Sequence, residues 1–271
     1  MAIKISEISQ TVTDVTKNTW VEVSEQDGST YTTKRYNLKD TGAARKQLLT
    51  SVTLTVGSGE QYTTINAALE YAVKKYYPIF LSGGTKPRVT IQLQAGFVMA
   101  EQVLVESLDL SWITITGVDD ETVINRSALT TYWGDGYPAF GATNGGFLPI
   151  IGQLFNMNTS GTATERHGIL AYSNSRAIVL GGCGVKNAGS NGIYAARNST
   201  INAHSADASG AGTYGIFASL GSLINANGAN ASGAISYGIF ATNGSLINAG
   251  GATGTLNQTK NTLTANGIIF Q

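Results

Sequence analysis

Cysteine, histidine and charged residues are scarce in this 271-residue chain. One cysteine cannot form an internal disulfide, and with two histidines no metal or cofactor site is expected. The 17 basic and 17 acidic residues balance, so the chain offers no broad basic surface for nucleic acid. The start, Met1-Ala2-Ile3-Lys4, lacks an apolar signal core, and no apolar run is long enough for a membrane span. We therefore expect no nucleic-acid partner, no membrane insertion and no conventional secretion.

Motifs of common enzyme classes are also missing. The sequence has no P-loop, no dinucleotide-binding fingerprint, no H-E-x-x-H and no G-x-S-x-G phrase. Cleavage of a glycosidic bond needs a pair of acids, or an acid with a base, across a groove. The acids in plausible positions are Glu101, Glu106, Asp109, Asp119, Asp120, Glu121, Asp135, Glu165 and Asp207. Their spacing assigns no pair, so no catalytic residue is predicted.

The strongest pattern is a repeat in the last hundred residues. The phrase Tyr-Gly-Ile-Phe-Ala occurs at 214–218 and 237–241, and a related phrase at 191–195, which gives a period of 23 residues. A second phrase, Ser-x-Ile-Asn-Ala, begins at Ser199, Ser222 and Ser245 with the same period. Because two independent phrases keep one period, they indicate stacked structural units.

Each repeat contains two short apolar runs separated by Gly, Asn, Ser and Ala, which is typical of strands and turns. A unit this small cannot bury its own apolar face, so a parallel β-solenoid with one repeat per coil is the simplest fit. Leucine-rich repeats fit less well because their leucine phrase is absent, and helical repeats because this composition opposes helices. The step predicts an internal column of Ile178, Ile201, Ile224 and Ile247, and an asparagine ladder of Asn202, Asn225 and Asn248.

The chain before the repeats predicts a cap and a beginning for the solenoid. Residues 64–73 place apolar side chains on one helical face, which should cover the first coil. Strands are predicted at 89–93, 103–105 and 113–117, so the solenoid should begin near residue 88. The expected division is an N-terminal module at 1–50, a linker and capping helix at 51–87, and the solenoid at 88–271.

Two stretches of sequence carry a resemblance to a known family. The run Gly-Ser-Gly-Glu-Gln-Tyr-Thr-Thr-Ile-Asn-Ala-Ala-Leu at 57–69, followed by the strand at 89–93 and by Trp-Ile-Thr-Ile-Thr-Gly at 112–117, resembles the opening of pectate-lyase-like β-helices, which phage tailspikes share. The resemblance implies an all-β fold, a right-handed parallel β-helix with a capping α-helix.

The first fifty residues extend this resemblance. Strand-like runs at 20–24 and 30–38 flank Asp27-Gly28, a pair typical of a hairpin turn. A leader, a hairpin and a linker in this order resemble the modules by which phage tail fibre and tailspike proteins join the virion. The resemblance implies that residues 1–50 bind a virion tail or baseplate protein, and that the chain is located in the virion tail after assembly in the host cytoplasm.

An aromatic insertion at 127–150 is too long for an ordinary turn between coils, and functional residues often lie on such insertions. Aromatic rings stack on the apolar C–H faces of sugars while an acid or amide orients the hydroxyls. The insertion therefore predicts a carbohydrate-binding set of Tyr132, Trp133, Asp135 and Tyr137. The alternative is that these rings pack against the β-helix or a neighbouring subunit.

A homotrimer is implied by the resemblance, and the repeats supply a physical reason for it. If Ile193, Ile216 and Ile239 point inward, strand alternation sends their aromatic neighbours outward. An exposed apolar stripe marks an interface. The predicted interface residues are Tyr194, Phe217 and Phe240, with Phe270 as an extension of the row.

Three classes of function remain. The first is a tail fibre or tailspike-like virion protein that attaches to host surface polysaccharide or forms a structural stem. The second is a polysaccharide depolymerase, a glycoside hydrolase or lyase, of the tailspike type. The third is a bacterial solenoid adhesin or structural protein, which the missing signal core disfavours. Enzymatic tailspikes generally resemble longer β-helices with more grooved surfaces, whereas the solenoid predicted here is short. Binding is therefore favoured over catalysis.

Overall fold

The computed structural model describes residues 20–27, 30–37, 45–78, 86–157, 165–255 and 267–270, with the first two ranges described by their backbone only. The chain divides into two compact units. The first unit is Met1–Thr50 with Glu70–Pro87, and the second is Ser51–Leu69 with Arg88–Gln271. Regular structure in the described residues is mostly β-strand, and the second unit contains the predicted repeats.

The first unit contains two short sheets. Strands β1 (Trp20–Asp27) and β2 (Thr30–Asn37) pair antiparallel, with Trp20 opposite Asn37 and Asp27 opposite Thr30. This is the pairing that the Asp-Gly signal predicts; residues 28 and 29 of the turn, like 1–19 and 38–44 of the predicted module, lie outside the described residues. Strands β3 (Lys46–Gln47) and β5 (Tyr76–Tyr77) pair in parallel.

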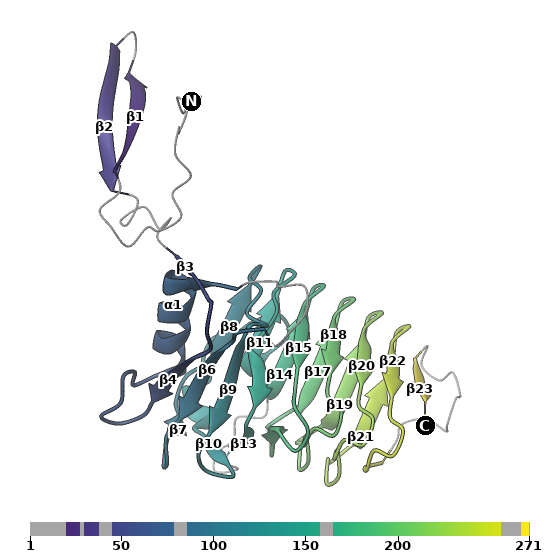
Figure 1. Cartoon of the computed structure of the whole chain (residues 1–271). Coiled ribbons are helices and arrows are strands. Elements are labelled where there is room, and N and C mark those ends of the chain that lie inside the picture. Colours follow the sequence, from purple (N-terminus) through teal and green to yellow (C-terminus); the bar gives the residue numbers. More distant parts are fainter. Residues whose placement is uncertain are drawn as a thin grey trace. The chain divides into compact units, whose positions relative to one another are not determined.

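The second unit is built from three series of parallel strands (Figure 1). The first series begins with a four-stranded sheet of β4 (Val52–Val56), β6 (Val89–Leu93), β9 (Ile113–Gly117) and β12 (Ile150–Gly152). A bridge between Ile151 and Val179 continues it into a five-stranded sheet. That sheet consists of β15 (Arg176–Ile178), β18 (Thr200–Asn202), β20 (Leu223–Asn225), β22 (Leu246–Asn248) and β23 (Ile268–Phe270).

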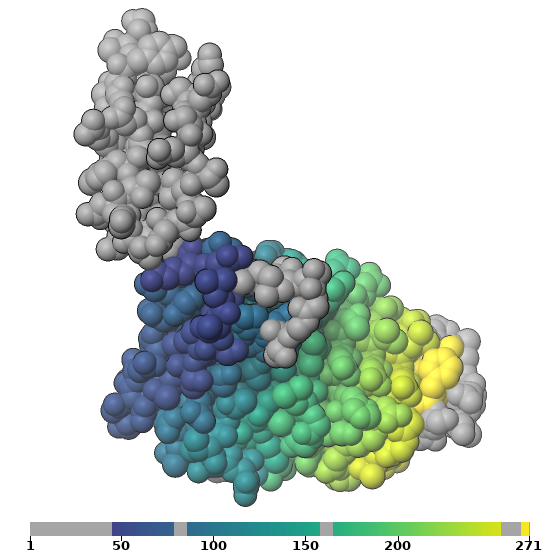
Figure 2. Space-filling view, in the orientation of Figure 1, coloured from purple at the N-terminus to yellow at the C-terminus, as the bar shows by residue number. Residues whose placement is uncertain are grey.

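In each of the other two series the parallel strands also stack in chain order. The six-stranded sheet consists of β8 (Val103–Glu106), β11 (Tyr137–Thr143), β14 (Arg166–Tyr172), β17 (Ile193–Ala196), β19 (Tyr214–Ser219) and β21 (Tyr237–Ala241). The second four-stranded sheet consists of β7 (Val98–Met99), β10 (Thr122–Ile124), β13 (Leu154–Met157) and β16 (Gly184–Lys186). Single bridges through Asp207, Asn230 and Thr253 extend it. In Figure 2 the stacking of the second unit appears as bands of colour that run from teal through green to yellow.

The 23-residue period of the sequence decides which residues of neighbouring parallel strands lie opposite each other. Ile216 lies opposite Ile239, and Ile224 lies opposite Ile247. A residue therefore contacts its equivalent in the next repeat, and side chains of one type form columns. Ile201, Ile224 and Ile247 are fully buried and form such a column, as predicted.

The predicted inclusion of Ile178 in that column is wrong. The residue opposite Ile201 is Ala177, and Ile178 lies opposite Asn202. The step between these strands is 24 residues instead of 23, and a shift of one residue along a strand reverses the face to which a side chain points. Ala177 is therefore buried and Ile178 half-buried.

Two polar ladders run along the stacked strands of the first series. The predicted asparagine ladder is confirmed: Nδ2 of Asn225 donates to Oδ1 of Asn202 at 3.1 Å, and Nδ2 of Asn248 donates to Oδ1 of Asn225 at 3.2 Å. The second ladder is buried and was not predicted. In it, the backbone N–H of Ser199 donates to Oγ of Ser222 at 3.1 Å, and the same contact recurs one repeat before and one repeat after.

The predicted helix is confirmed as α1 (Ile65–Lys75), and the boundary between the two units falls within it. Its first turn is held in the second unit by Glu101, whose carboxylate accepts the N–H of Ile65 at 2.6 Å and that of Asn66 at 3.0 Å. The parallel strands begin earlier than the predicted residue 88, because β4 pairs with β6 from Val52 onward. Among the described residues, no helix is long and apolar enough to cross a membrane.

Candidate functional site

The outward side of the six-stranded sheet carries a continuous group of aromatic rings. Ile193, Ile216 and Ile239 are fully buried, so their neighbours in the strands point to the opposite side. Two of these neighbours, Tyr194 and Phe217, stack with ring centroids 4.6 Å apart. Tyr214, the first residue of β19, joins the group through its ring contact with Phe240 at 4.5 Å. We call this group the aromatic face, and it consists of Tyr172, Tyr194, Tyr214, Phe217, Tyr237 and Phe240.

The predicted trimer-interface residues differ in exposure. Phe217 and Phe240 are half-buried, whereas Tyr194 is only 5% exposed and is covered by its own chain. Phe270 does not extend the row, because it belongs to β23 of the five-stranded sheet and lies opposite Asn248. The aromatic face is therefore closed around Tyr194 and opens toward Tyr237, which is 37% exposed.

The connection at 129–136 covers Tyr194. The Tyr194 hydroxyl donates to Oδ2 of Asp135 at 2.9 Å, and Nε2 of His167 donates to the backbone carbonyl of Asp135 at 2.8 Å. At Gly136, φ is 148° and a Cβ atom would collide with the ring of His167, so the close approach of this connection to the sheet requires glycine. The aromatic insertion and the aromatic face thus form one site.

Burial shifts the pKa of two groups under this connection. It lowers the pKa of His167, against a smaller opposing effect of Asp135 and Glu165, so the imidazole is neutral at neutral pH. Its Nδ1 accepts the backbone N–H of Asn191 at 3.3 Å, which fixes the proton on Nε2. Burial also raises the pKa of Tyr194, so that its phenol remains a hydrogen-bond donor.

The four predicted carbohydrate-binding residues separate into two pairs. Tyr132 is 59% exposed and meets the half-buried ring of Tyr137 edge to face, with centroids 5.4 Å apart. Trp133 is half-buried with its indole nitrogen enclosed, and the carboxylate of Asp135 is engaged by Tyr194. The ring of Tyr132 is therefore open to solvent, whereas Trp133 and Asp135 hold the connection in place.

Arg166 contacts one of these tyrosines, and the sequence did not predict this contact. Its guanidinium carbon lies 4.3 Å from the centre of the Tyr137 ring, a cation–π contact. The contact follows from the register of β11 and β14, which places Arg166 opposite Tyr137. No local pattern in the sequence signals a pairing over this separation.

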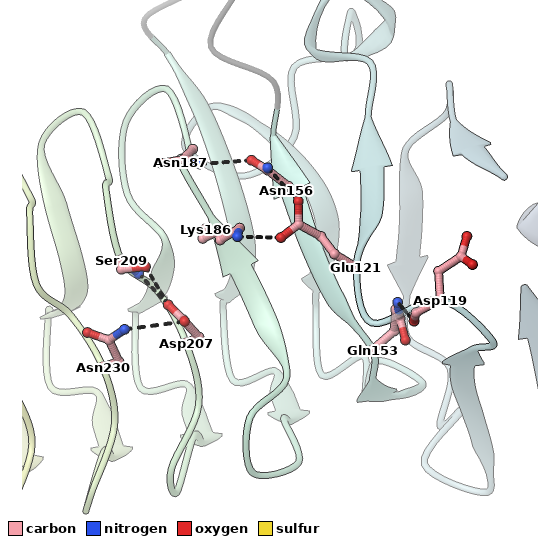
Figure 3. Close-up of polar contacts among 9 residues, drawn as sticks. All are labelled: Asp119, Glu121, Gln153, Asn156, Lys186, Asn187, Asp207, Ser209 and Asn230. Atoms are coloured by element: carbon pink, nitrogen blue, oxygen red, sulfur yellow. Dashed lines mark hydrogen bonds and ion pairs between the residues drawn. The ribbon is translucent and has the colours of Figure 1, made fainter. Parts of the chain in front are cut away.

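The third series carries a row of polar side chains on neighbouring strands (Figure 3). Glu121 pairs with Lys186 and accepts Nδ2 of Asn156 at 2.6 Å. Burial opposes the shift, but these two partners outweigh it and lower the pKa of Glu121. A carboxylate held in its charged form is unsuited to donate a proton, so Glu121 is a poor general acid.

Other candidate acids also have structural partners. Asp207 accepts the backbone N–H and the hydroxyl of Ser209 at 2.9 and 2.6 Å, and Nδ2 of Asn230 at 3.3 Å (Figure 3). Four more accept structural hydrogen bonds: Glu101 from the backbone of Ile65, Glu106 from Asn144, Asp109 from the backbone of Ser111 and Asp119 from that of Gly96. These hydrogen bonds hold strands and turns of the second unit in place.

Within the ranges that the structure describes, no group of three or more His, Cys, Asp or Glu side chains could hold a metal ion. The site offers ring surface, the guanidinium of Arg166 over the ring of Tyr137, that of Arg197 over the ring of Tyr172, and a connection held by hydrogen bonds. Compared with known proteins, the chain matches no protein family and no curated protein.

Proposed function

We propose that this chain is a phage virion tail protein, of the tail fibre or tailspike kind, that attaches to host surface polysaccharide. The observation that supports binding best is the exposed ring of Tyr132 against the half-buried ring of Tyr137, beside the guanidinium of Arg166. Two rings at an angle, with a cation next to them, can hold the C–H face of a sugar and orient its hydroxyls. A rigid sheet below them keeps this arrangement in place without a ligand.

The proposed architecture of the second unit is a right-handed parallel β-helix. Three series of parallel strands with one register step per repeat support it, because one strand of each repeat joins each series. Crossovers between parallel strands are right-handed in nearly all proteins, which gives the handedness. Such a solenoid suits a virion component because stacked repeats form a stiff rod whose length scales with repeat number.

The proposed assembly is a homotrimer docked on the tail. The open part of the aromatic face, from Tyr214 to Tyr237 and Phe240, is an apolar stripe of the kind that subunits bury. Three copies about a common axis would cover one another's stripes. Residues 1–50, with the paired strands β1 and β2, would bind a tail or baseplate protein. The chain would be assembled in the host cytoplasm and located in the virion tail.

Binding to an array of bacterial surface polysaccharides tests this function. The full chain should bind at least one of them, and Tyr132→Ala or Tyr137→Ala should weaken that binding about tenfold or more, as expected for loss of a stacking ring of a few kcal/mol. Tyr77→Ala is the matched control, because Tyr77 is 42% exposed and lies in the first unit. Absence of binding to every polysaccharide would reject the proposal.

A polysaccharide depolymerase is the alternative that the same samples distinguish. After incubation, new reducing ends or unsaturated sugars would identify cleavage. The structural partners of Glu121 and Asp207 support binding without cleavage. We expect polysaccharide of unchanged length.

A further inference from the structure

The same turn conformation recurs at five successive connections that lead from the six-stranded sheet to the first series of strands. In each turn, two consecutive residues have positive φ, between 50° and 78°. These pairs are residues 144–145, 173–174, 197–198, 220–221 and 243–244. Two central residues with positive φ define a turn that favours Asn followed by Gly. The first and the last of the five turns contain this pair.

A backbone hydrogen bond links each turn to the next one along the stack. The N–H of the second residue in one turn donates to the carbonyl of the first residue in the following turn. The bonds are Gly145 to Ser173 at 3.0 Å, Asn174 to Arg197 at 2.9 Å, Asn198 to Leu220 at 3.0 Å and Gly221 to Asn243 at 2.9 Å. Gly244 is the second residue of the fifth turn, and its N–H donates to no residue that the structure describes. Within the described chain, the ladder therefore ends at an N–H without an acceptor.

The two Asn-Gly turns differ in the hydrogen bonds that hold them. Nδ2 of Asn144 donates to Oε1 of Glu106 at 2.6 Å, and the N–H of Gly145 is bound in the ladder. Asn243 and Gly244 are exposed, and no other described residue accepts from the side-chain amide of Asn243 or from the N–H of Gly244. The two turns thus share a sequence and a backbone conformation, but only the first is held by these bonds.

The remaining Asn-Gly pairs of the described chain are also held. Asn191 is buried, and the N–H of Gly192 donates to the carbonyl of Tyr214 at 3.0 Å. Asn227 is half-buried, and the N–H of Gly228 donates to the carbonyl of Gly250 at 2.8 Å. A further pair begins at residue 266, which lies outside the described residues. Among the described pairs, the glycine N–H therefore lacks an acceptor only at 243–244.

An Asn-Gly pair can lose its side-chain amide by a reaction within the pair. The backbone nitrogen of the glycine attacks Cγ of the asparagine, a C–N bond forms, and the amide nitrogen leaves as ammonia with the proton of the attacking N–H. Solvent water then opens the cyclic imide at either carbonyl and leaves aspartate or isoaspartate. Glycine favours the attack because it has no Cβ and its backbone rotates freely. An N–H that is already bound must first give up its hydrogen bond, which raises the barrier.

We propose that Asn243-Gly244 is a site of spontaneous deamidation in the folded chain, and that the hydrogen bonds of the equivalent turn protect Asn144. The inference goes beyond the proposed function and does not rest on it, because the reaction needs only this chain and water. The product places a carboxylate in the fifth turn, and isoaspartate also lengthens the backbone there by one methylene. Both changes occur at the residue whose carbonyl accepts the N–H of Gly221.

Peptide mapping by mass spectrometry of the folded full chain tests the proposal. The chain is kept in mildly alkaline buffer and then digested with pepsin in acid, which halts the reaction. Conversion of amide to acid is followed over time at each asparagine. We expect Asn243 to convert at least about tenfold faster than Asn144, a difference of about 1.4 kcal/mol in barrier. Asn191 and Asn227 should also convert more slowly than Asn243. Equal rates at Asn243 and Asn144, or no conversion at Asn243, would overturn the proposal.

The same chain unfolded in denaturant is the matched control. Asn144, Asn191, Asn227 and Asn243 should then convert at similar rates, because each is followed by glycine and the fold no longer holds any of them. If the preference for Asn243 persisted in denaturant, it would come from the local sequence, and the protective role of the turn ladder would be refuted.

Glu106→Ala tests the protection of Asn144 directly. Glu106 is exposed, so its truncation should leave the fold intact, as checked by thermal unfolding. Conversion of Asn144 should rise about threefold or more, because its side-chain amide loses a hydrogen bond. Conversion of Asn243 in the same digest should stay unchanged and serves as the internal reference. An unchanged rate at Asn144 would overturn the assignment of protection to its bond with Glu106.

Discussion

The hydroxyl of Tyr194 donates a hydrogen bond to Oδ2 of Asp135 at 2.9 Å, although the two residues are 59 positions apart. The contact joins the aromatic insertion to the first ring of the repeated aromatic row. It also divides the aromatic face into a closed part under the connection at 129–136 and an open part at Tyr214, Tyr237 and Phe240. Ligand binding is proposed beside the closed part, and subunit contact at the open part.

Acid should loosen the connection through His167. Burial lowers its folded-state pKa, so below the unfolded value of about 6.5 the unfolded chain binds the proton more readily, and the free energy of unfolding falls as pH falls. Protonation would also place a hydrogen on Nδ1 of His167. Nδ1 could then no longer accept the backbone N–H of Asn191, and the two N–H groups would face each other. Denaturant unfolding between about pH 7 and 5 should show this loss in the wild type.

His167→Gln should remove much of that pH dependence, whereas His204→Gln, at an exposed position, should retain it. Saccharide affinity should fall over the same pH range in the wild type. If wild type and His167→Gln lose stability in parallel, the buried imidazole does not control the connection.

The open part of the aromatic face should govern assembly. Tyr237 is 37% exposed, and Ile235, which lies two residues before it in the chain, is 81% exposed. Their joint replacement by serine should spare the folded chain and remove apolar area at and beside the open part of the face. Light scattering at micromolar concentration should give a trimeric mass for the wild type and a monomeric mass for the double variant. Leu223→Ser is the control, because Leu223 is 46% exposed on the five-stranded sheet. A monomeric wild type would reject the trimer.

The isoleucine column should not tolerate charge. Ile224 is fully buried, with Ile201 and Ile247 opposite it in the two neighbouring strands. Ile224→Asp would bury an unpaired carboxylate between two apolar side chains and should cost about 4 kcal/mol or more. Leu223→Asp, on the exposed side of the same strand, should cost less than about 1 kcal/mol. Similar losses in thermal unfolding would contradict the assignment of the two faces.

The buried serine ladder should contribute to stability through its hydroxyls. Ser222→Ala removes Oγ, which accepts the backbone N–H of Ser199 at 3.1 Å, and leaves that N–H buried without a partner. The expected cost is about 1–3 kcal/mol. Ser232→Ala is the control, because its hydroxyl bonds to Asn230 at an exposed position. Chemical denaturation measures both, and a cost of Ser222→Ala no larger than the control would show that the ladder is dispensable.

Removal of residues 1–50 should separate folding from attachment. The second unit begins at Ser51, so the remaining chain should stay soluble and retain its parallel strands, as checked by circular dichroism. We expect this truncated chain to be missing from purified virions when it replaces the full chain during assembly. Its normal incorporation would refute the assignment of residues 1–50 as the attachment module.

The sequence by itself determined the features that depend on local pattern. The 23-residue phrases predicted which isoleucines stack and where the asparagine ladder runs, because equal steps place equal residues opposite each other. Apolar spacing predicted the helix, and alternation predicted that Phe217 and Phe240 lie on the side of their strands opposite the buried Ile216 and Ile239. These outcomes need no knowledge of contacts beyond the neighbouring repeat.

Only the tertiary structure decided the features that depend on connection length and on distant residues. One additional residue in a repeat moves Ile178 out of the column, and strand order places Phe270 on a different sheet from Phe240. The enclosure of Tyr194 arises where an irregular connection folds back on the sheet. No repeat encodes that path, because the connection occurs once and its contacts span tens of residues.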